Sequence, residues 1–276
     1  MARLMKILSL GAGVQSSTLF LMSCHGDMPR LDAAVFADTG WEPAEVYEWL
    51  ETVLKPASEA AGIPIYTASG GDLRADAMTS TIRAHVGDGA HVESSLPLYV
   101  TGVGDGDGGI LRRQCTKRYK IRPIRRVCRD IMGVSRRGHM PAGAVEMWIG
   151  ISADEASRMK PSGLQWLTHT WPLIDHDPPM RRSDCHAWLR RNGYEGAPRS
   201  ACNGCPFRSD AEWKHLKSTS PTDWGDAVEF DGAVRQLDKM GGEAFIHRKK
   251  VPLKDAVLED QTPRLWDDEC SGMCGV

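Results

Sequence analysis

The stretch from Met5 to Ser17, which reads Met-Lys-Ile-Leu-Ser-Leu-Gly-Ala-Gly-Val-Gln-Ser-Ser, decides the fold. Its first six residues are mostly apolar and predict a short buried strand, and a helix is expected from Ser17 to about Cys24. Between them, Gly11 and Gly13 allow the backbone to approach an anion, and the helix N-terminus and serine hydroxyls add donors. The loop lacks the lysine of a Walker A motif and the third glycine of a dinucleotide fingerprint. It therefore predicts a phosphate site, with a tight strand–helix turn as the alternative.

Strands and helices alternate outward from this stretch. Strands are expected at 31–36 and 64–67 with a long helix at 43–61 between them, and further strands at 147–151 and 171–174. Such alternation is typical of an α/β fold, here a doubly wound, mostly parallel, Rossmann-like sheet. Residues from about 195 onward carry a CxxC pair and predict a smaller cysteine-bearing C-terminal lobe. We therefore expect two domains, 1–194 and 195–276.

Composition excludes several classes of protein. The 276 residues are 41% hydrophobic and carry a formal net charge of −2, which are ordinary values for a globular protein. No apolar run approaches the roughly 18–20 residues that span a bilayer, and no secretory signal is recognisable at the N-terminus. The sequence predicts a cytoplasmic protein with no membrane contact.

Two further polar loops follow predicted strands. Asp38, Thr39 and Gly40 end the second strand, and the segment 150–158, with Arg158 at its end, follows a later one. Ligands of parallel sheets lie beyond the carboxyl ends of the strands, so these loops support the first one. The alternatives are that Asp38 or Thr39 caps the next helix and that 150–158 is a surface loop.

A strongly basic stretch lies in the middle of the chain. Eleven Lys and Arg residues fall between Arg112 and Arg137, and Asp130 is the one acid among them. This excess favours an anionic ligand, for which Lys117, Lys120 and Arg122 are candidates, over a solvated helix face. Cys115 lies in the same stretch, where the basic surroundings favour its thiolate.

The eight cysteines predict metal or redox chemistry better than disulfides. Cys202 and Cys205 form a CxxC pair, which can hold one metal ion or one cluster, or act as a redox dithiol. Cys270 and Cys274 add two thiols near the C-terminus.

Together these motifs resemble the PP-loop adenine-nucleotide alpha-hydrolase superfamily, and within it the phosphoadenosine phosphosulfate (PAPS) reductase family. The loop at 11–16 is similar to the PP-loop, with Gln15 in place of the usual aspartate, as in the reductase branch. The Asp-Thr-Gly at 38–40, the Cys115–Pro123 segment, the 150–158 segment and the Pro-Leu-Ile-Asp at 172–175 resemble further family segments in the family's order. The single Cys115, where the family has a tandem pair, and the shortened C-terminal ending depart from the pattern.

The resemblance implies a function and a set of site residues. The nucleotide, ATP or PAPS/APS, would be held by Ser9, Gly11, Gly13, Gln15, Ser16, Ser17, Asp38, Thr39 and Gly40. Lys117, Lys120, Arg122 and Arg158 would hold the sulfate or second phosphate, and Cys270 would be the catalytic nucleophile. A thiol reductant such as thioredoxin would release sulfite. Cys115, Cys202, Cys205 and Cys274 would bind a [4Fe–4S] cluster, with Cys270 or Cys185 as other candidates for the fourth ligand.

Two alternatives remain open. Other superfamily members are ATP-dependent sulfurtransferases that adenylylate a nucleic acid and exchange AMP for sulfur from a sulfur donor, as in tRNA thiolation or DNA phosphorothioation. The basic stretch and the single Cys115 fit such an enzyme with a nucleic-acid partner. The third interpretation is a nucleotide-binding module in which zinc replaces the cluster.

Overall fold

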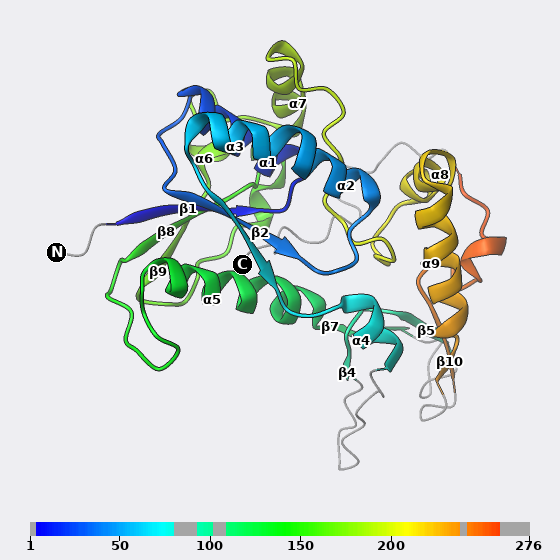
Figure 1. Cartoon of the computed structure of the whole chain (residues 1–276). Helices are drawn as coiled ribbons and strands as arrows, with labels where there is room; N and C mark the ends of the chain where they lie inside the picture. Colours follow the sequence, from blue (N-terminus) through cyan, green and yellow to red (C-terminus); the bar gives the residue numbers. More distant parts are fainter. Residues whose placement is uncertain (1–3, 80–92, 102–108, 238–241, 260–276) are drawn as a thin grey trace.

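The computed structural model of the chain describes residues 4–79, 93–101, 109–237 and 242–259. A five-stranded sheet forms its centre, in the order β3-β2-β1-β8-β9, and every neighbouring pair is parallel (Figure 1). The strands are β1 (Met5–Leu10), β2 (Ala33–Asp38), β3 (Ile65–Ser69), β8 (Val145–Ile149) and β9 (Leu167–Thr170). The prediction of an α/β fold with a parallel sheet is confirmed. The chain adds strands first to one side of β1 and then to the other, which creates a switch point between β1 and β8.

Helices cover both faces of this sheet, which explains why β1 is apolar on both sides. Leu8 and Leu10 of β1 pack in one hydrophobic cluster with α1 (Val14–His25) and α7 (Arg182–Arg191). Ile7 points the other way, into a cluster with residues of α5 (Arg122–Ile131). All three side chains are completely buried.

The long helix predicted at 43–61 is present as α2 (Ala44–Trp49), a π-helical turn η1 (Leu50–Leu54) and α3 (Lys55–Ala61) in succession. A second π-helical segment, η2 (Thr116–Ile121), leads into α5.

The prediction of a strand at 171–174 is wrong. Those residues enter the short helix α6 (Pro172–Asp175), and the strand β9 ends just before it at Thr170. Pro172 occupies the first turn of α6, where its fixed φ suits a helix and its missing N–H costs no bond. The stretch is apolar, as a strand would be, but its residues adopt a helical conformation.

The remaining elements gather beside the main sheet. They are η3 (Ala153–Arg158), α4 (Leu73–Thr79), β4 (Glu93–Ser94), β5 (Tyr99–Thr101), β6 (Gly109–Ile110), β7 (Arg112–Arg113), α8 (Asp210–Thr219), α9 (Pro221–Ala233), β10 (Gln236–Leu237), β11 (Gly242–Phe245) and η4 (Leu253–Asp255). Strands β10, β11, β5 and β6 form an antiparallel sheet, and β4 pairs with β7.

One hydrophobic cluster draws on residues from both sides of the predicted boundary at 195. Trp213, Phe230 and Ile246 pack there with Trp41 and Tyr119. The C-terminal residues therefore share their core with earlier parts of the chain. In the described part of the chain, no helix has the length and apolar character that crossing a membrane requires.

Candidate anion site beside a buried CxxC pair

The loop between β1 and α1 is held by its own serine and by a distant segment. The backbone N–H of Gly11 donates to Ser16 Oγ at 3.3 Å, and that hydroxyl donates to the carbonyl of Gly13 at 3.3 Å. Ala12 has a left-handed φ of 54°. A Cβ on Gly13 would lie 2.7 Å from the Cβ of Ser200, so only glycine lets the 200 segment approach this closely.

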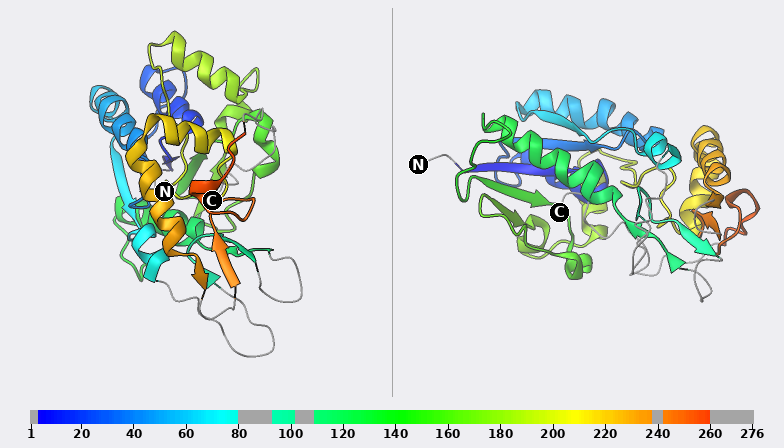
Figure 2. Two further views of the ribbon diagram at one scale, coloured as in Figure 1. Left: turned by 90° about the vertical axis from the view of Figure 1, so that its right-hand side faces the viewer. Right: turned by 90° about the horizontal axis from the view of Figure 1, so that it is seen from below.

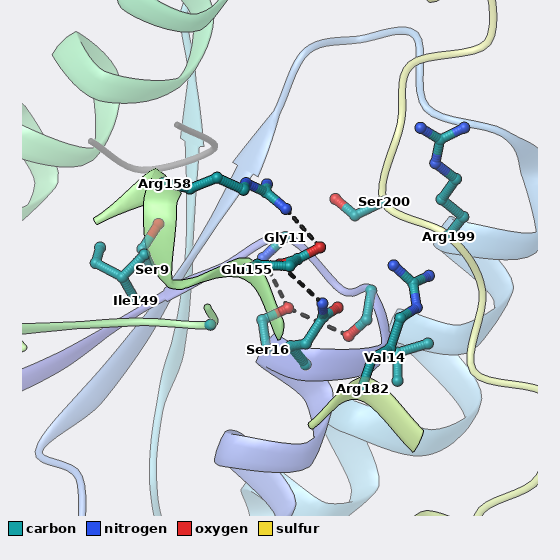
Figure 3. A pocket seen from close by; sticks show the side chains of 13 residues that line it. Ser9, Gly11, Val14, Ser16, Ile149, Glu155, Arg158, Arg182, Arg199 and Ser200 are labelled. Carbon is teal, nitrogen blue, oxygen red and sulfur yellow. Dashed lines mark hydrogen bonds and ion pairs between the residues drawn. The ribbon is translucent and has the colours of Figure 1, made fainter. Parts of the chain in front are cut away.

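This loop forms one wall of a pocket (Figure 3). The other walls come from the end of β8, from η3, from the start of α7 and from the segment before the CxxC pair. The lining residues are Ser9, Gly11, Gly13, Val14, Gln15, Ser16, Ile149, Gly150, Glu155, Arg158, Arg182, Arg199 and Ser200. The pocket lies where β1 and β8 end, at the switch point of the sheet.

Three arginines converge on the pocket from three segments: Arg158 ends η3, Arg182 begins α7, and Arg199 precedes the CxxC pair. Burial lowers the pKa of the Arg182 guanidinium, since charge is costly away from water. The Ser200 hydroxyl is buried and has no hydrogen-bond partner among the residues that the structure describes. Converging guanidinium groups, a buried hydroxyl and a glycine loop form a site for an oxyanion.

Glu155 is the acid within this ring of cations. Its carboxylate accepts from Gln15 Nε2 at 3.1 Å and pairs with Arg158 at 2.6 Å (Figure 3). Burial raises the pKa of Glu155, while Arg158 and Arg182 oppose that shift. In this structure the Glu155 carboxylate therefore accepts hydrogen bonds that Gln15 and Arg158 could otherwise donate to a ligand in the pocket.

The second predicted loop lies at the neighbouring strand end. Asp38 closes β2, and its carboxylate accepts from the Gly40 N–H and from the Tyr47 hydroxyl, both at 2.8 Å. Burial and the hydrogen bond to Asp38 raise the pKa of Tyr47. Thr39 is fully buried and donates to Glu42 at 2.9 Å.

Thr39 connects this strand end to the CxxC pair. Its hydroxyl lies 3.5 Å from the Cys202 Sγ, and Glu42 lies 3.6 Å from the same sulfur. The Lys120 ammonium lies 3.5 Å from Glu42, with both side chains almost completely buried. Burial raises the pKa of the Cys202 thiol well above its usual value, and Lys120 opposes that shift.

Three of the thiols predicted to bind the cluster lie within the described residues. Cys202 and Cys205 are buried, and Cys115 packs against the same hydrophobic cluster. Burial raises the pKa of Cys205, whereas Arg199, Arg208 and Lys120 favour its thiolate. Two thiols at CxxC spacing, with cations beside them, are a pair of the kind that can contribute to one metal site.

No three His, Cys, Asp or Glu side chains are grouped for metal binding within the described ranges. Cys270 and Cys274 lie outside those ranges, so the predicted nucleophile and fourth ligand remain predictions.

The structure brings six of the predicted site residues together around the pocket: Ser9, Gly11, Gly13, Gln15, Ser16 and Arg158. Ser17 faces the core instead, where its Oγ accepts from Trp49 Nε1 at 3.0 Å. Lys117 and Arg122 are exposed on η2 and α5. Lys120 lies at the CxxC pair.

Sequence reasoning missed Glu155, Arg182, Arg199 and Ser200 as site residues. Glu155 was within the segment 150–158 that the sequence singled out, and Arg199 and Ser200 directly precede the CxxC pair. Their positions next to recognised motifs were the available signal. Arg182 carries no such signal.

No protein-family model matches the chain, and no curated protein sequence matches it significantly.

Proposed function

We propose that the protein is an adenine-nucleotide-dependent enzyme of sulfur chemistry, with the nucleotide phosphate in the arginine pocket. One observation carries the proposal: Arg158, Arg182 and Arg199 converge on a glycine loop at the switch point of a parallel sheet. The glycine loop supplies backbone donors, and the guanidinium groups supply paired donors for phosphate or sulfate oxygens.

The leading reaction is reduction of an adenylyl sulfate, as the resemblance to PAPS reductases implies. The Cys270 thiolate would attack the sulfate sulfur, and the sulfur–oxygen bond would break as AMP or its 3′-phosphate leaves with the electron pair. An external thiolate would then attack the Cys270 sulfur, and sulfite would leave with the bonding electrons. A second external thiol reduces the mixed disulfide, so two thiols are oxidised for each sulfite released.

Within this reaction the described residues bind and orient. Arg158, Arg182 and Arg199 would neutralise the anion, and Ser200, packed closely on Gly13, forms part of the wall of the pocket. Cys115, Cys202, Cys205 and Cys274 would hold the [4Fe–4S] cluster, which would supply electron transfer when bound.

A second candidate is an ATP-dependent sulfurtransferase that acts on a nucleic acid. The observation that favours it is the set of exposed basic side chains on α5 and the loop that follows.

Anaerobic purification followed by measurement of iron, acid-labile sulfide and zinc per chain tests the metal assignment. We expect about four irons with matching sulfide. The variant C202A/C205A should lose the iron and the sulfide. C128A is the control, since Cys128 is buried in a different hydrophobic cluster from the CxxC pair. Stoichiometric zinc without sulfide would contradict the cluster and leave the zinc-containing module.

Turnover is tested separately with adenylyl sulfate, PAPS and a dithiol. Equal release of sulfite and the adenine nucleotide is expected from the wild type, and none from C270S. Absence of both products from a cluster-loaded protein that binds AMP would eliminate the reductase and favour the sulfurtransferase.

A further inference from the structure

The continuous helix formed by η2 and α5 has one buried and one exposed side. Tyr119, Ile124 and Cys128 are buried, the latter two against the central sheet. Arg122 and Arg126, one helical turn apart, are exposed. Helix α5 lies along β2 and β3, on the opposite side of the sheet from α1 (Figures 1 and 2).

Five exposed bases of this region form what we call the basic surface. They are Lys117, Arg122, Arg126, Arg136 and Arg137. None of the five makes a side-chain hydrogen bond or ion pair with another residue in the described part of the chain. Asp130 is the exposed acid on the same helix. The basic surface thus carries positive charge that the fold itself does not neutralise.

The neighbouring bases, in contrast, have partners within the fold. Arg118 pairs with Asp76 at 3.3 Å, and Arg125 donates to the Ser162 carbonyl at 3.4 Å. Arg129 donates to the carbonyls of Ser135 at 2.7 Å and Gly138 at 2.6 Å. These bonds fix the 135–138 loop against the end of α5, and so they hold Arg136 and Arg137 beside the helix.

An exposed tyrosine lies on the strand that packs beside α5. Tyr66 lies on β3, the edge strand, and is 41% exposed. Ala68, two residues further on, points to the same side of the sheet and packs with Ile124 and Cys128 of α5. Tyr66 therefore stands on the α5 side of the sheet edge.

The direction of β3 places Tyr66 along α5. A Cβ on Gly70 would lie 2.9 Å from the Tyr119 Cα, so the end of β3 meets the start of the helix. Tyr66 lies four residues, or about 13 Å, back along the strand. Because β3 and α5 run in opposite directions (Figure 1), this places it near the second half of α5, where Arg126 lies.

We propose that the basic surface and Tyr66 bind a single-stranded nucleic acid. Unneutralised arginines complement a phosphate backbone, and an exposed aromatic ring stacks on an unpaired base. A duplex hides its bases from such a ring. A membrane surface would need the apolar side of α5, which is packed on the sheet. The inference goes beyond the nucleotide pocket and does not depend on it.

Fluorescence anisotropy of the full-length protein with labelled dT20 and U20, from 50 to 200 mM salt, tests the proposal. Each phosphate contact contributes about 0.7 to the slope of log K against log salt. R126A/R136A should therefore lower the slope by about 1.4, so its affinity should fall about 7-fold less than that of the wild type over this range. Y66A should weaken binding about 5-fold or more without changing the slope.

R190A/R191A is the matched control, because it removes two exposed arginines from α7. It should bind like the wild type. The proposal would be overturned if the two double variants changed oligonucleotide affinity equally or if R126A/R136A kept the salt slope of the wild type. It would also be overturned if the wild-type protein bound neither oligonucleotide. Duplex DNA bound as tightly as dT20, with no effect of Y66A, would also overturn it.

Preference between dT20 and U20 identifies the sugar of the ligand. Calorimetric titration with AMP separates this proposal from the proposed function. R126A/R136A should bind AMP like the wild type. Weaker oligonucleotide binding by R126A/R136A with intact AMP binding supports the proposal, whereas wild-type protein that binds oligonucleotides but not AMP contradicts only the proposed function.

Discussion

Replacing Glu155 by glutamine should tighten anion binding in the arginine pocket. The carboxylate holds Arg158 at 2.6 Å and Gln15 at 3.1 Å, and both of these residues line the pocket. An incoming phosphate must compete with it for these donors and must approach a negative charge. Glutamine has nearly the same shape, keeps a carbonyl acceptor for one of the two donors and removes the charge.

The expected gain follows from the bond that the ligand has to displace. A hydrogen bond between charged groups contributes about 1.5–3 kcal/mol net. The amide retains part of that bond to Arg158, so we expect a gain of about 1–2 kcal/mol, which is roughly 5- to 30-fold in Kd.

Isothermal titration with AMP and with pyrophosphate, at fixed salt and pH, measures this gain. E48Q is the matched control, since it removes the same charge from an exposed position on α2. Weaker binding by E155Q would show that the carboxylate itself holds the ligand, through a hydroxyl or an amine. Equal binding by E155Q and the wild type would place the anion elsewhere and refute the reasoning.

Three further outcomes are expected. R182A should weaken AMP binding at least 10-fold, because it removes a charge-assisted pair of donors, whereas R190A on the outside of α7 should not, by the same titration. Sulfate, which keeps its charge over this range, should bind more tightly as pH falls from 8 to 5. The pKa of Glu155 is raised, and its protonation removes the charge that competes with the anion; E155Q should therefore lack this trend. W213A should lower the free energy of unfolding by about 3–5 kcal/mol in urea titrations, because Trp213 is completely buried; a loss under 1 kcal/mol would contradict its place in the core.

Local patterns predicted the centre of the fold well. The run from Met5 to Leu10 is apolar at every position but Lys6 and Ser9, as a strand covered on both faces requires, and β1 has these bounds. The loop after it was predictable because glycine spacing and serine position act within a few residues. The short helix α6 was not predictable in this way, since four residues give no period that separates a helix from a strand.

A sequence motif alone does not show which of two adjacent helical residues faces the pocket. Ser16 and Ser17 both follow the glycine loop, yet their side chains point about 100° apart. Ser16 lines the pocket, while Ser17 turns to the core and accepts a bond from Trp49. The partner comes from another helix, so the sequence around the loop held no information on which serine would face the anion.

The cations of the pocket were harder to predict because they come from separated parts of the chain. Arg158 was predicted since it ends a polar loop after a strand, but Arg182 lies in an ordinary charged helix start. Only the packing of α7 against α1 brings it to the glycine loop. Conversely, Lys120 was expected at the anion, and its helix turns it toward Glu42 and Cys202.

The segment from Arg199 to Cys205 couples the two parts of the site. Arg199 and Ser200 line the anion pocket, and Cys202, two residues further on, is buried against Thr39. Because a Cβ on Gly13 would strike Ser200, the glycine loop sets the position of this segment, and the segment sets the position of the thiols. A shift of the 200 segment upon anion binding would therefore move Cys202 as well, so in the proposed enzyme the pocket and the thiols would be coupled through this segment.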